Sequence, residues 1–493
     1  MVKQSPSSWL EKMQLRPRTT IFVLCLLLHL AGTWAIPLID RDEPRFAEAA
    51  REMIERRDFI VPYFNNDYRF DKPPLIYWLQ VPCYLLLGEN DFAARLPSSL
   101  AAALTALVIF GMGRRMFDAQ TGFRAAIIFS FCLQTMMLAK AATADMVMIL
   151  WVTVTMALGW RIFAAVRASE KVTWALWLGY YCALALGFLA KGPIAWIAIG
   201  ALPLAGVWTG TRGLNRTLAL WFGLPLALGL VAIWGIPAMQ QTNGEYFNVG
   251  IGKHVVKRSI SAMEGHGSKN ALSYIALLPL YFLTVFGSFF PWSLKLVPAA
   301  RYFLGAGGKD MRVRFLIAPV LLVFVIFSLL KTKLPHYTLP AFPMMALLMA
   351  HWLGQRPDVE SWFRRCWAGV AIVAAVLFLV VAPFAAPLFP AWQLARISAP
   401  HLKPEMEFAS EEFEEPSLVW YFRKHVDGFY SKPSPKKFPK YMAEKGPRFC
   451  VLPTGEVSTI LPDADPAWKR FDVRGINVAK GRLVELTMFI KEE

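Results

Sequence analysis

Residues 21–38 of the chain, IFVLCLLLHLAGTWAIPL, contain no acidic residue, lysine or arginine, and the charged stretch IDRDEPRF at 39–46 follows them directly. An uncharged run of this length is long enough to cross the ~30 Å hydrocarbon core of a bilayer as a helix. The charged stretch begins where the chain would leave the membrane. The sequence therefore predicts a spanning helix whose outer end carries a dense group of acids and bases.

Comparable apolar runs recur along most of the 493 residues, 56% of which are hydrophobic. A soluble globular protein of this length does not need so much apolar surface. We therefore predict an all-α polytopic membrane protein with about eleven transmembrane helices. The predicted spans are 21–38, 96–113, 125–139, 146–160, 172–190, 192–211, 217–237, 271–294, 315–330, 336–353 and 366–388.

Arginines and lysines gather at the N-terminus and in alternate connections between these spans, as at 114–124, 161–171 and 356–365. Positive residues mark the cytoplasmic side of a membrane protein. The loops 39–93 and 238–270 and the C-terminal tail are then expected to face outward.

The last predicted span ends in a proline-rich passage, with prolines at 383, 387, 390 and 400. Beyond it, short alternations of apolar and polar residues, as at 448–452 and 482–486, predict β-strands. We therefore divide the chain into a transmembrane catalytic module, 1–388, and a small extramembrane α/β domain, 389–493.

The formal net charge of +17 is only partly explained by topology, because the outward loops are also rich in arginine and lysine. These cations indicate an anionic partner. A polytopic membrane protein is poorly placed to bind nucleic acid, whereas a phosphate-bearing lipid lies at the same surface.

Two segments of the first outward loop predict helices that lie at the membrane surface. Residues 43–57 form an amphipathic pattern, which suits the interface. Residues 75–88 are apolar, but they are too few to cross the bilayer, so we expect a second interfacial or re-entrant helix.

Asp42 is the first candidate for chemistry, because it lies where the first span meets the outer surface. A carboxylate there could cap the following helix, since Asp is a favourable N-cap residue. It could also deprotonate a hydroxyl acceptor as a general base, with Arg45 one turn away to keep it ionised or to hold a phosphate. The two roles are compatible. Glu43 is expected to complement the N-terminal dipole of the helix.

The segment YRFDKPP at 68–74 places Asp71 beside Lys72, just before two prolines. An ordinary exposed turn is the alternative to a site. The proline pair, however, favours an extended backbone before it, so both side chains would project from a stiff strand. Asp71 could bind a divalent metal, and Lys72 could pair with a phosphate oxygen.

Lys140, Asp145 and Lys191 interrupt apolar sequence at the predicted outer ends of their spans. Ionisable residues in membrane segments are costly and are therefore candidates for function. The two lysines could instead extend toward the interface. A short Asp side chain is poorly suited to that, so Asp145 is the stronger candidate.

Two histidines, His254 and His266, share the second outward loop with Lys253 and Arg258. A histidine is more often structural than a ligand, but here the neighbouring cations suit a phosphate. One of the two could bind a metal, although their spacing matches no dedicated metal motif.

The segment KTKLPHYTLP at 331–340 joins two predicted spans at their outer ends. Lys333 and Tyr337 could close a site from the far side of the bundle. Anchoring of the helix ends by Lys and Tyr is the alternative.

All five clusters fall on the predicted outer face, although they are dispersed along the sequence. Acids and bases that converge at a membrane surface fit an enzyme acting on a lipid phosphate. A flippase or transporter would explain the spans and cations, but it predicts charges near mid-span and inverted repeats, and the sequence shows neither. A scaffold that binds a partner through its tail explains none of the clusters.

Three motifs in order, DEPRFAE at 42–48 with REM at 51–53, DKPPLIYW at 71–78 and KLPHYTLP at 333–340, resemble those of bacterial GT-C membrane glycosyltransferases. They are most similar to the 4-amino-4-deoxy-L-arabinose transferases, which are related to the protein O-mannosyltransferases. The resemblance covers most of 19–353. It implies a helical bundle with two outward juxtamembrane helices, and a sugar donor carried on a polyprenyl phosphate.

The resemblance also implies a role for each candidate. Asp42 would be the catalytic base, with Arg45 beside it. The donor phosphate would be bound by Lys72, Arg258, Lys191 and Lys333. The pocket would be lined by Asp145, Tyr337 and Lys253. One divalent metal is implied at Asp71 and His254, with His266 as the alternative ligand.

The expected activity is transfer of a sugar from a polyprenyl-phosphate-sugar to an acceptor at the periplasmic face of the bacterial inner membrane. The acceptor would be of the lipid A or lipopolysaccharide type, or another envelope glycan. A protein acceptor, as in O-mannosyltransferases, is the alternative.

Overall fold

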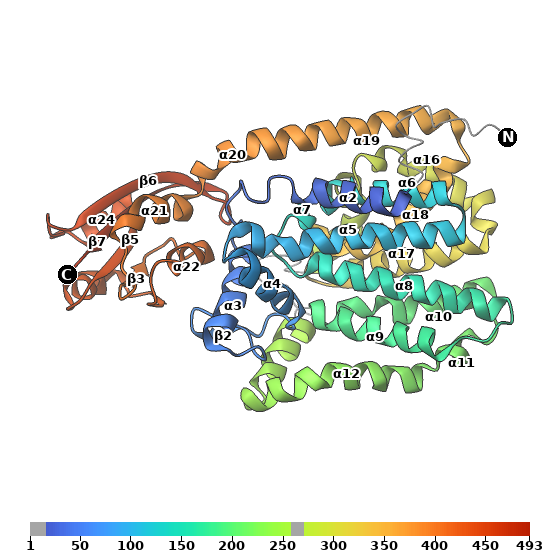
Figure 1. Ribbon diagram of the computed structural model, residues 1–493, viewed down its shortest axis with the longest axis horizontal. Coiled ribbons are helices and arrows are strands. Elements are labelled where there is room, and N and C mark those ends of the chain that lie inside the picture. The colour runs from blue at the N-terminus through green and yellow to red at the C-terminus, as the bar shows by residue number, and fades with distance from the viewer. Residues whose placement is uncertain (1–15, 258–270) are drawn as a thin grey trace.

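The computed structural model describes residues 16–257 and 271–493. It consists of a helical bundle and a smaller β-sheet domain at one end of it, as Figure 1 shows. Residues 31–90 lie at the same end of the bundle as the sheet domain (Figure 1).

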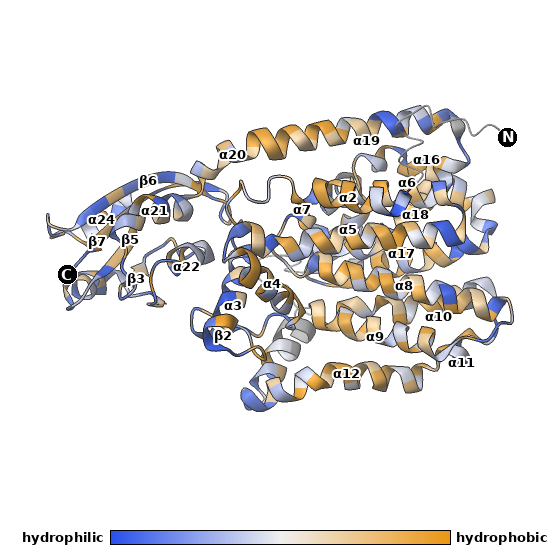
Figure 2. Cartoon of the chain, viewed as in Figure 1, coloured by the Kyte–Doolittle hydropathy of each residue, from blue (hydrophilic) through white to orange (hydrophobic). Residues whose placement is uncertain are grey.

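The bundle is built from helices whose apolar residues recur along most of their length, and Figure 2 shows these surfaces between more polar helix ends. Its helices are α2 (Pro17–Leu30), α5 (Asp91–Met116), α6 (Ala119–Ser130), α7 (Leu133–Ala139), α8 (Asp145–Arg167), α9 (Trp174–Lys191), α10 (Ile197–Thr209), α11 (Leu214–Leu218), α12 (Leu220–Gln241), α14 (Ala271–Leu277), α15 (Leu280–Ser288), α16 (Leu296–Leu304), α17 (Met311–Leu329), α18 (Phe342–Gly354), α19 (Glu360–Ala375) and α20 (Ala382–Ala385).

Among the described residues, 6 helices are long and apolar enough to cross a membrane, or up to 8 if each of two bent pairs is one span. The chain is thus a multi-pass membrane protein, while the number of eleven spans stays a prediction. Two predicted spans are bent. The pair α6 and α7 turns by 68°, and the helices Leu272–Ser288 and Trp292–Leu304 meet at 112°. Pro291 lies at the second break, where a proline cannot continue the backbone hydrogen bonding of a helix.

Two juxtamembrane helices follow α2, as the apolar patterns predicted. They are α3 (Asp42–Arg56) and α4 (Leu75–Leu87), and the short hairpin β1 (Tyr63–Phe64) and β2 (Asp67–Tyr68) lies between them. Helix α3 has no side-chain cap at its N-terminus, and Asp42 is its first residue. The capping role expected for Asp42 is therefore wrong, because its carboxylate lies within the first turn and does not precede it.

The C-terminal domain contains a five-stranded mixed sheet in the order β4-β3-β5-β7-β6. Parallel pairing joins β3 to β4 and β5, whereas β7 runs antiparallel to both β5 and β6. The strands are β3 (Glu407–Ser410), β4 (Tyr430–Ser431), β5 (Arg448–Pro453), β6 (Lys469–Asn477) and β7 (Arg482–Lys491). The helices are α21 (Pro390–Ser398), α22 (Pro416–Phe422), α23 (Phe438–Ala443) and α24 (Val457–Ile460).

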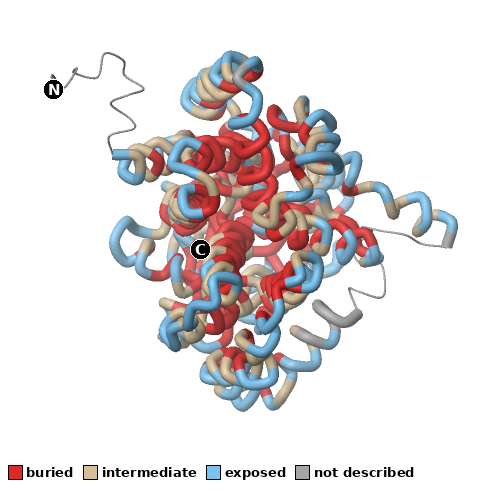
Figure 3. The backbone as a smooth tube through the Cα atoms, turned by 90° about the vertical axis from the view of Figure 1, so that its right-hand side faces the viewer, coloured by how far each residue is buried: buried red, intermediate tan, exposed pale blue. Residues whose placement is uncertain are grey.

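Burial is concentrated along the centre of the bundle, and Figure 3 shows this core surrounded by partly exposed helices. The span Glu360–Leu388 lies outside it: only 11% of its most apolar window is buried against the rest of the chain. In a bilayer its apolar side chains would face lipid. Residues 31–43 cross the end of this bundle that lies nearest the sheet domain (Figure 1), and the candidate site is built around them.

Candidate active site

Glu43 holds the start of α3 in place through a buried ion pair with Arg95. The Arg95 Nη2 lies 2.6 Å from Oε2 of Glu43, and its Nε lies 3.0 Å from Oε1. The same carboxylate accepts hydrogen bonds from the backbone N–H groups of Ile39, at 2.7 Å, and Ala142, at 2.6 Å. We expected Glu43 to complement the dipole of the helix. Its contacts with Arg95 and Ala142 also fix α3 against α5 and against the segment before α8. Asp42, the preceding residue, is exposed.

Arg69 links the hairpin to the juxtamembrane helices. Its Nη2 lies 3.2 Å from Oδ2 of Asp71, and its Nε donates to the Tyr77 hydroxyl at 3.1 Å. The guanidinium also lies 5.1 Å from the centre of the Phe46 ring on α3. Burial opposes its charge, but Tyr77, Asp71 and Asp42 outweigh that effect and raise the pKa of Arg69. Arg69 is thus a buried cation that pairs with Asp71 and on which the charge of Asp42 also acts.

Lys72 is held at the edge of the same group. Its Nζ donates to the carbonyl oxygen of Asp71 at 3.0 Å, and its own carbonyl accepts from the Tyr246 hydroxyl at 2.8 Å. Tyr246 begins the π-helical segment Tyr246–Lys257 and packs edge-on against Phe70. The second outward loop therefore contacts the first through Tyr246.

The predicted loop cations and histidines lie at or beyond this segment. Lys253 and His254 belong to the π-helix. Arg258 and His266 lie outside the described residues. The roles expected for all four stay predictions.

Asp145, the first residue of α8, forms an ion pair with Lys191, the last residue of α9. Nζ of Lys191 lies 2.5 Å from Oδ1 of Asp145, and the Thr143 hydroxyl donates to Oδ2 at 3.2 Å. The charge of His336 also acts on Asp145. Because Ala142 donates to Glu43, the segment that carries Thr143 and Asp145 is tied to the start of α3.

Lys333 and Tyr337 lie where α17 ends and the 3₁₀ segment Pro335–Ala341 begins. The Lys333 ammonium donates to the carbonyl oxygens of Ser328 and, at 3.1 Å, Phe327. Burial lowers its pKa. This favours the helix-end role of Lys333 over its expected phosphate contact. The Tyr337 ring packs 5.2 Å from that of Phe327 and follows His336 directly.

An apolar cavity of about 840 Å³ opens beside Asp42. Asp40, Arg41, Asp42 and Lys140 line it together with side chains from α7, α19 and the segment around Pro291. Lys140 donates to the carbonyl oxygens of Leu28, His29 and Ala31, so it also closes the end of α2. An apolar cavity with a few polar groups is typical of a site for a lipid or a large ligand.

The described residues give limited support to a metal site. Within 16–257 and 271–493, no group of three His, Cys, Asp or Glu side chains is placed to hold an ion. Asp71, the expected ligand, is paired with Arg69. A metal at Asp71 and His254 stays a prediction.

Comparisons with known proteins show the family and the fold of the chain. The family described as dolichyl-phosphate-mannose-protein mannosyltransferase matches residues 71–236. The undecaprenyl phosphate-alpha-4-amino-4-deoxy-L-arabinose arabinosyl transferase of Pectobacterium atrosepticum is 30% identical over 402 residues, which are 77% of this chain and 68% of that protein. The chain belongs to this arabinosyl transferase family.

A second relative, the arabinosyl transferase of Pectobacterium carotovorum, is 31% identical over 76% of this chain and 66% of its own length. The chain thus spans about two thirds of these relatives. Among solved structures, ArnT from Cupriavidus metallidurans bound to undecaprenyl phosphate superposes with a TM-score of 0.77 at 19% identity, over 96% of this chain and 98% of that one. That similarity supports the fold, and it confirms the predicted GT-C bundle with a small C-terminal domain.

The structure brings several of the predicted site residues into two groups. One contains Asp42, Asp71 and Lys72, and the other contains Asp145 and Lys191. Tyr337 packs against Phe327 instead. The two groups are joined through Glu43 and the segment that donates to it. Arg45 lies one turn into α3, where its charge acts on Asp40.

Three residues that matter in this geometry were not among the predicted site residues. Arg69 pairs with Asp71, Tyr77 accepts a hydrogen bond from Arg69, and the charge of His336 acts on Asp145. All three stand within or beside the quoted motifs. Their proximity to the candidates along the chain was therefore the available signal.

Proposed function

We propose that the chain transfers a sugar from a polyprenyl-phosphate-sugar to a lipid acceptor, with an undecaprenyl-linked aminoarabinose as the first donor to test. The observation that carries the proposal is the position of Asp42. It is an exposed carboxylate beside an apolar cavity, and its charge acts on the buried Arg69, which pairs with Asp71 in the segment that carries Lys72. A lipid-linked substrate needs such a junction of apolar and charged surface.

The transfer exchanges one bond to the anomeric carbon for another. The bond from that carbon to the phosphate oxygen breaks, and the electron pair stays on the departing polyprenyl phosphate. The acceptor oxygen bonds to the same carbon and gives its proton to Asp42. Cations placed where the negative charge develops lower the barrier. Lys72 is the cation proposed for this role, because Arg69 joins its segment to α3 through contacts with Asp71 and Phe46.

Asp42 suits the role of general base because the residue that follows it is held firmly in place. Its neighbour Glu43 is fixed by four hydrogen bonds, from Arg95, Ile39 and Ala142. The start of α3 is thereby immobilised while the Asp42 carboxylate faces the cavity. A general base placed in this way typically accelerates a reaction by about 10²–10⁴-fold.

An acceptor that reacts through a phosphate group would not require a general base. A phosphate monoester is already ionised at neutral pH, because its second pKa is about 6. It needs no base, and Asp42 would repel it unless cations such as Arg45 offset the charge. A hydroxyl acceptor therefore gives Asp42 its clearest catalytic role.

Further expectations belong to this proposal. The site and the C-terminal domain would lie on the periplasmic side of a bacterial inner membrane, as the distribution of arginine and lysine predicts. A divalent metal held by Asp71 and His254 would add positive charge near the donor phosphate. No step above depends on that metal.

A protein acceptor is the second candidate, because the family matching residues 71–236 is described as transferring mannose to protein. The apolar cavity beside Asp42 favours a lipid acceptor, since a protein substrate needs no lipid-lined approach.

The test uses the purified full chain in detergent with undecaprenyl phosphate-aminoarabinose labelled in the sugar. Lipid A and an extract of envelope proteins are offered as acceptors in separate reactions. We expect label in lipid A and release of undecaprenyl phosphate. Label in protein would support the second candidate, and label in neither acceptor would contradict the proposal for this donor.

A further inference from the structure

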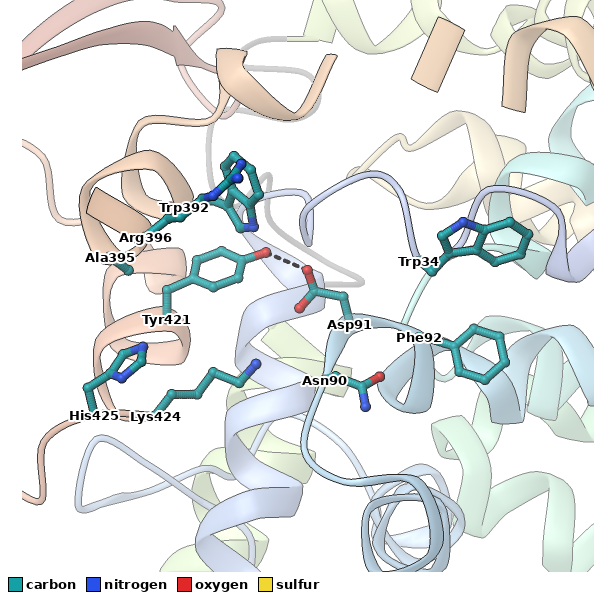
Figure 4. A pocket seen from close by; sticks show the side chains of 10 residues that line it. All are labelled: Trp34, Asn90, Asp91, Phe92, Trp392, Ala395, Arg396, Tyr421, Lys424 and His425. Carbon is teal, nitrogen blue, oxygen red and sulfur yellow. Dashed lines mark hydrogen bonds between the residues drawn. The ribbon is translucent and has the colours of Figure 1, made fainter. Parts of the chain in front are cut away.

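A second pocket, of about 360 Å³, lies at the junction between the bundle and the C-terminal domain. Figure 4 shows the side chains that line it. Trp34 and Phe92 come from the membrane module, whereas Trp392, Arg396, Lys424 and His425 come from the C-terminal domain. Its volume lies in the usual range for small-ligand sites, about 300–1,000 Å³.

The floor of the pocket is rigidly built. Asp91, the first residue of α5, accepts hydrogen bonds from Nε1 of Trp420 and from the Tyr421 hydroxyl, both at 2.8 Å. The Tyr421 hydroxyl in turn accepts from the backbone N–H of Leu38 at 2.8 Å. These contacts fix α22 against α5 and against the segment that leads to Asp42. They also occupy both oxygens of the one carboxylate that lines the pocket.

Two cations of the pocket are available to a ligand. Arg396 and Lys424 are both exposed. Neither forms an ion pair with any residue in 16–257 or 271–493. The Arg396 guanidinium lies 5.2 Å from the centre of the Trp392 ring, which orients it along the pocket wall. Lys424 points into the space between Tyr421 and Asn90 (Figure 4). The pocket is therefore positively charged and suited to a phosphate.

Aromatic rings give the pocket a second type of contact. Trp34 is 60% exposed, although it is a large apolar side chain. It lies between the end of α2 and the start of α3, where a spanning helix leaves the membrane. Indole rings are favoured at that depth, next to lipid headgroups. Exposed indole faces together with cations are suited to a sugar that carries phosphate.

The location links this pocket to the proposed reaction. Residues 32–43 separate it from the apolar cavity: Trp34 lines the pocket, whereas Thr33, Ile36 and Asp42 line the cavity. A lipid whose headgroup occupied the pocket could extend its acyl chains toward the bilayer and present the rest of its headgroup near Asp42. Lys72, the cation proposed to bind the donor phosphate, lies instead beside Tyr246, whose hydroxyl donates to its carbonyl oxygen.

We propose that this pocket, formed by Trp34, Trp392, Arg396 and Lys424, binds the phosphorylated sugar headgroup of the acceptor lipid. The assignment as the acceptor's site rests on the proposed function. The binding of a phosphorylated glycolipid does not, and it can be measured without turnover.

The test compares the full chain in detergent with the double variant Arg396→Gln/Lys424→Gln. The control is Lys436→Gln/Lys437→Gln, which removes two exposed lysines of the same domain away from the pocket. Native mass spectrometry measures retention of lipid A, of lipid A without its phosphates, and of phosphatidic acid. Steady-state transfer gives the KM for lipid A and for the donor.

We expect the double variant to retain lipid A about 100-fold less well and to raise its KM by a similar factor, because each of the two charge-assisted contacts contributes about tenfold. The control and the donor KM should be unchanged. The variant Trp34→Ala should weaken retention of lipid A but leave phosphatidic acid unaffected, since phosphatidic acid has no sugar to pack on the ring.

Equal retention of lipid A by the double variant and the wild type would overturn the proposal, and so would lower retention with an unchanged KM. Equal loss of phosphatidic acid and lipid A in Trp34→Ala would contradict recognition of the sugar. If retention depends on Arg396 and Lys424 but the wild type transfers no sugar, the proposed function fails while the binding site stands.

Discussion

Asp42 and Glu43 are adjacent carboxylates at the start of α3, but their surroundings differ. Glu43 is 4% exposed and accepts four hydrogen bonds, whereas Asp42 is exposed and lines the apolar cavity. A buried and fully bonded carboxylate is committed to structure. An exposed one beside it remains available to a substrate.

The Glu43–Arg95 pair gives a prediction about stability. Removal of one partner of a buried ion pair leaves an uncompensated charge and typically costs about 3–5 kcal/mol. We expect Arg95→Met to lower the free energy of unfolding by about this amount in detergent. Arg470→Met, which breaks an exposed pair with Asp472, should cost less than about 1 kcal/mol. Equal effects of the two substitutions would argue against the structural role of Arg95.

Lys72 gives a prediction about the donor. Loss of a cation that contacts the leaving phosphate should lower kcat/KM by about 10–100-fold, since a hydrogen bond to a charged group contributes about 1.5–3 kcal/mol. We expect this for Lys72→Gln, with the melting temperature unchanged. Lys436→Gln serves as the control. A Lys72→Gln enzyme with full activity would exclude the phosphate role.

At the scale of elements, α3 and α22 form the contact that joins the two parts of the chain. Arg423, just after α22, lies 2.7 Å from Oε2 of Glu55, and Arg51 donates to the carbonyl oxygen of Trp420 at 3.2 Å. Ser417 donates to Asp40 through its backbone N–H, at 2.9 Å, and through its hydroxyl. The helix that begins with Asp42 is thus held by the C-terminal domain.

Asp40 makes this contact dependent on pH. Burial raises its pKa to about 7, and Glu415 adds to that effect, while Ser417 and Arg45 oppose it. A carboxyl whose pKa is raised by folding stabilises the fold in its protonated form, and that contribution is lost as the pH rises through about 7. We expect the melting temperature to fall as the pH rises from about 4 to about 7 and to level off above that, and to fall less in Asp40→Asn. Parallel pH profiles for the two proteins would contradict this.

At the scale of the whole molecule, much of the architecture was predictable. Apolar runs identified the bundle, and periodicity identified α3, α4 and the strands β5 and β7. These patterns are local in sequence. The bend near Pro291 and the non-capping position of Asp42 were missed, because both depend on how the chain packs after its elements form.

The candidate site was predictable only where its residues stand out in the local sequence. Asp42, Lys72 and Asp145 stand in unusual sequence contexts, so they could be selected one by one. The pairing of Lys191 with Asp145 joins residues far apart in the sequence. The contacts of Lys333 with Phe327 and of Arg69 with Asp71 are local, but they depend on how the side chains pack, which the sequence pattern does not specify.

The orientation of the molecule can be tested by labelling. Single cysteines would replace Asp463 in the C-terminal domain and Glu170 at the other end of the bundle, in a background without native cysteines. A membrane-impermeant maleimide should label Asp463→Cys in intact spheroplasts, and Glu170→Cys only after permeabilisation. The reverse pattern would place the site on the cytoplasmic side.

The central claim is that Asp42 takes the acceptor proton. Its most direct test is the rate of sugar transfer from the labelled donor to lipid A by Asp42→Asn, with Asp463→Asn, another exposed Asp, as the control. We predict a loss of about 10²–10⁴-fold for Asp42→Asn, with unchanged melting temperature and donor binding, and wild-type activity for the control. Transfer by Asp42→Asn at the wild-type rate would contradict the account.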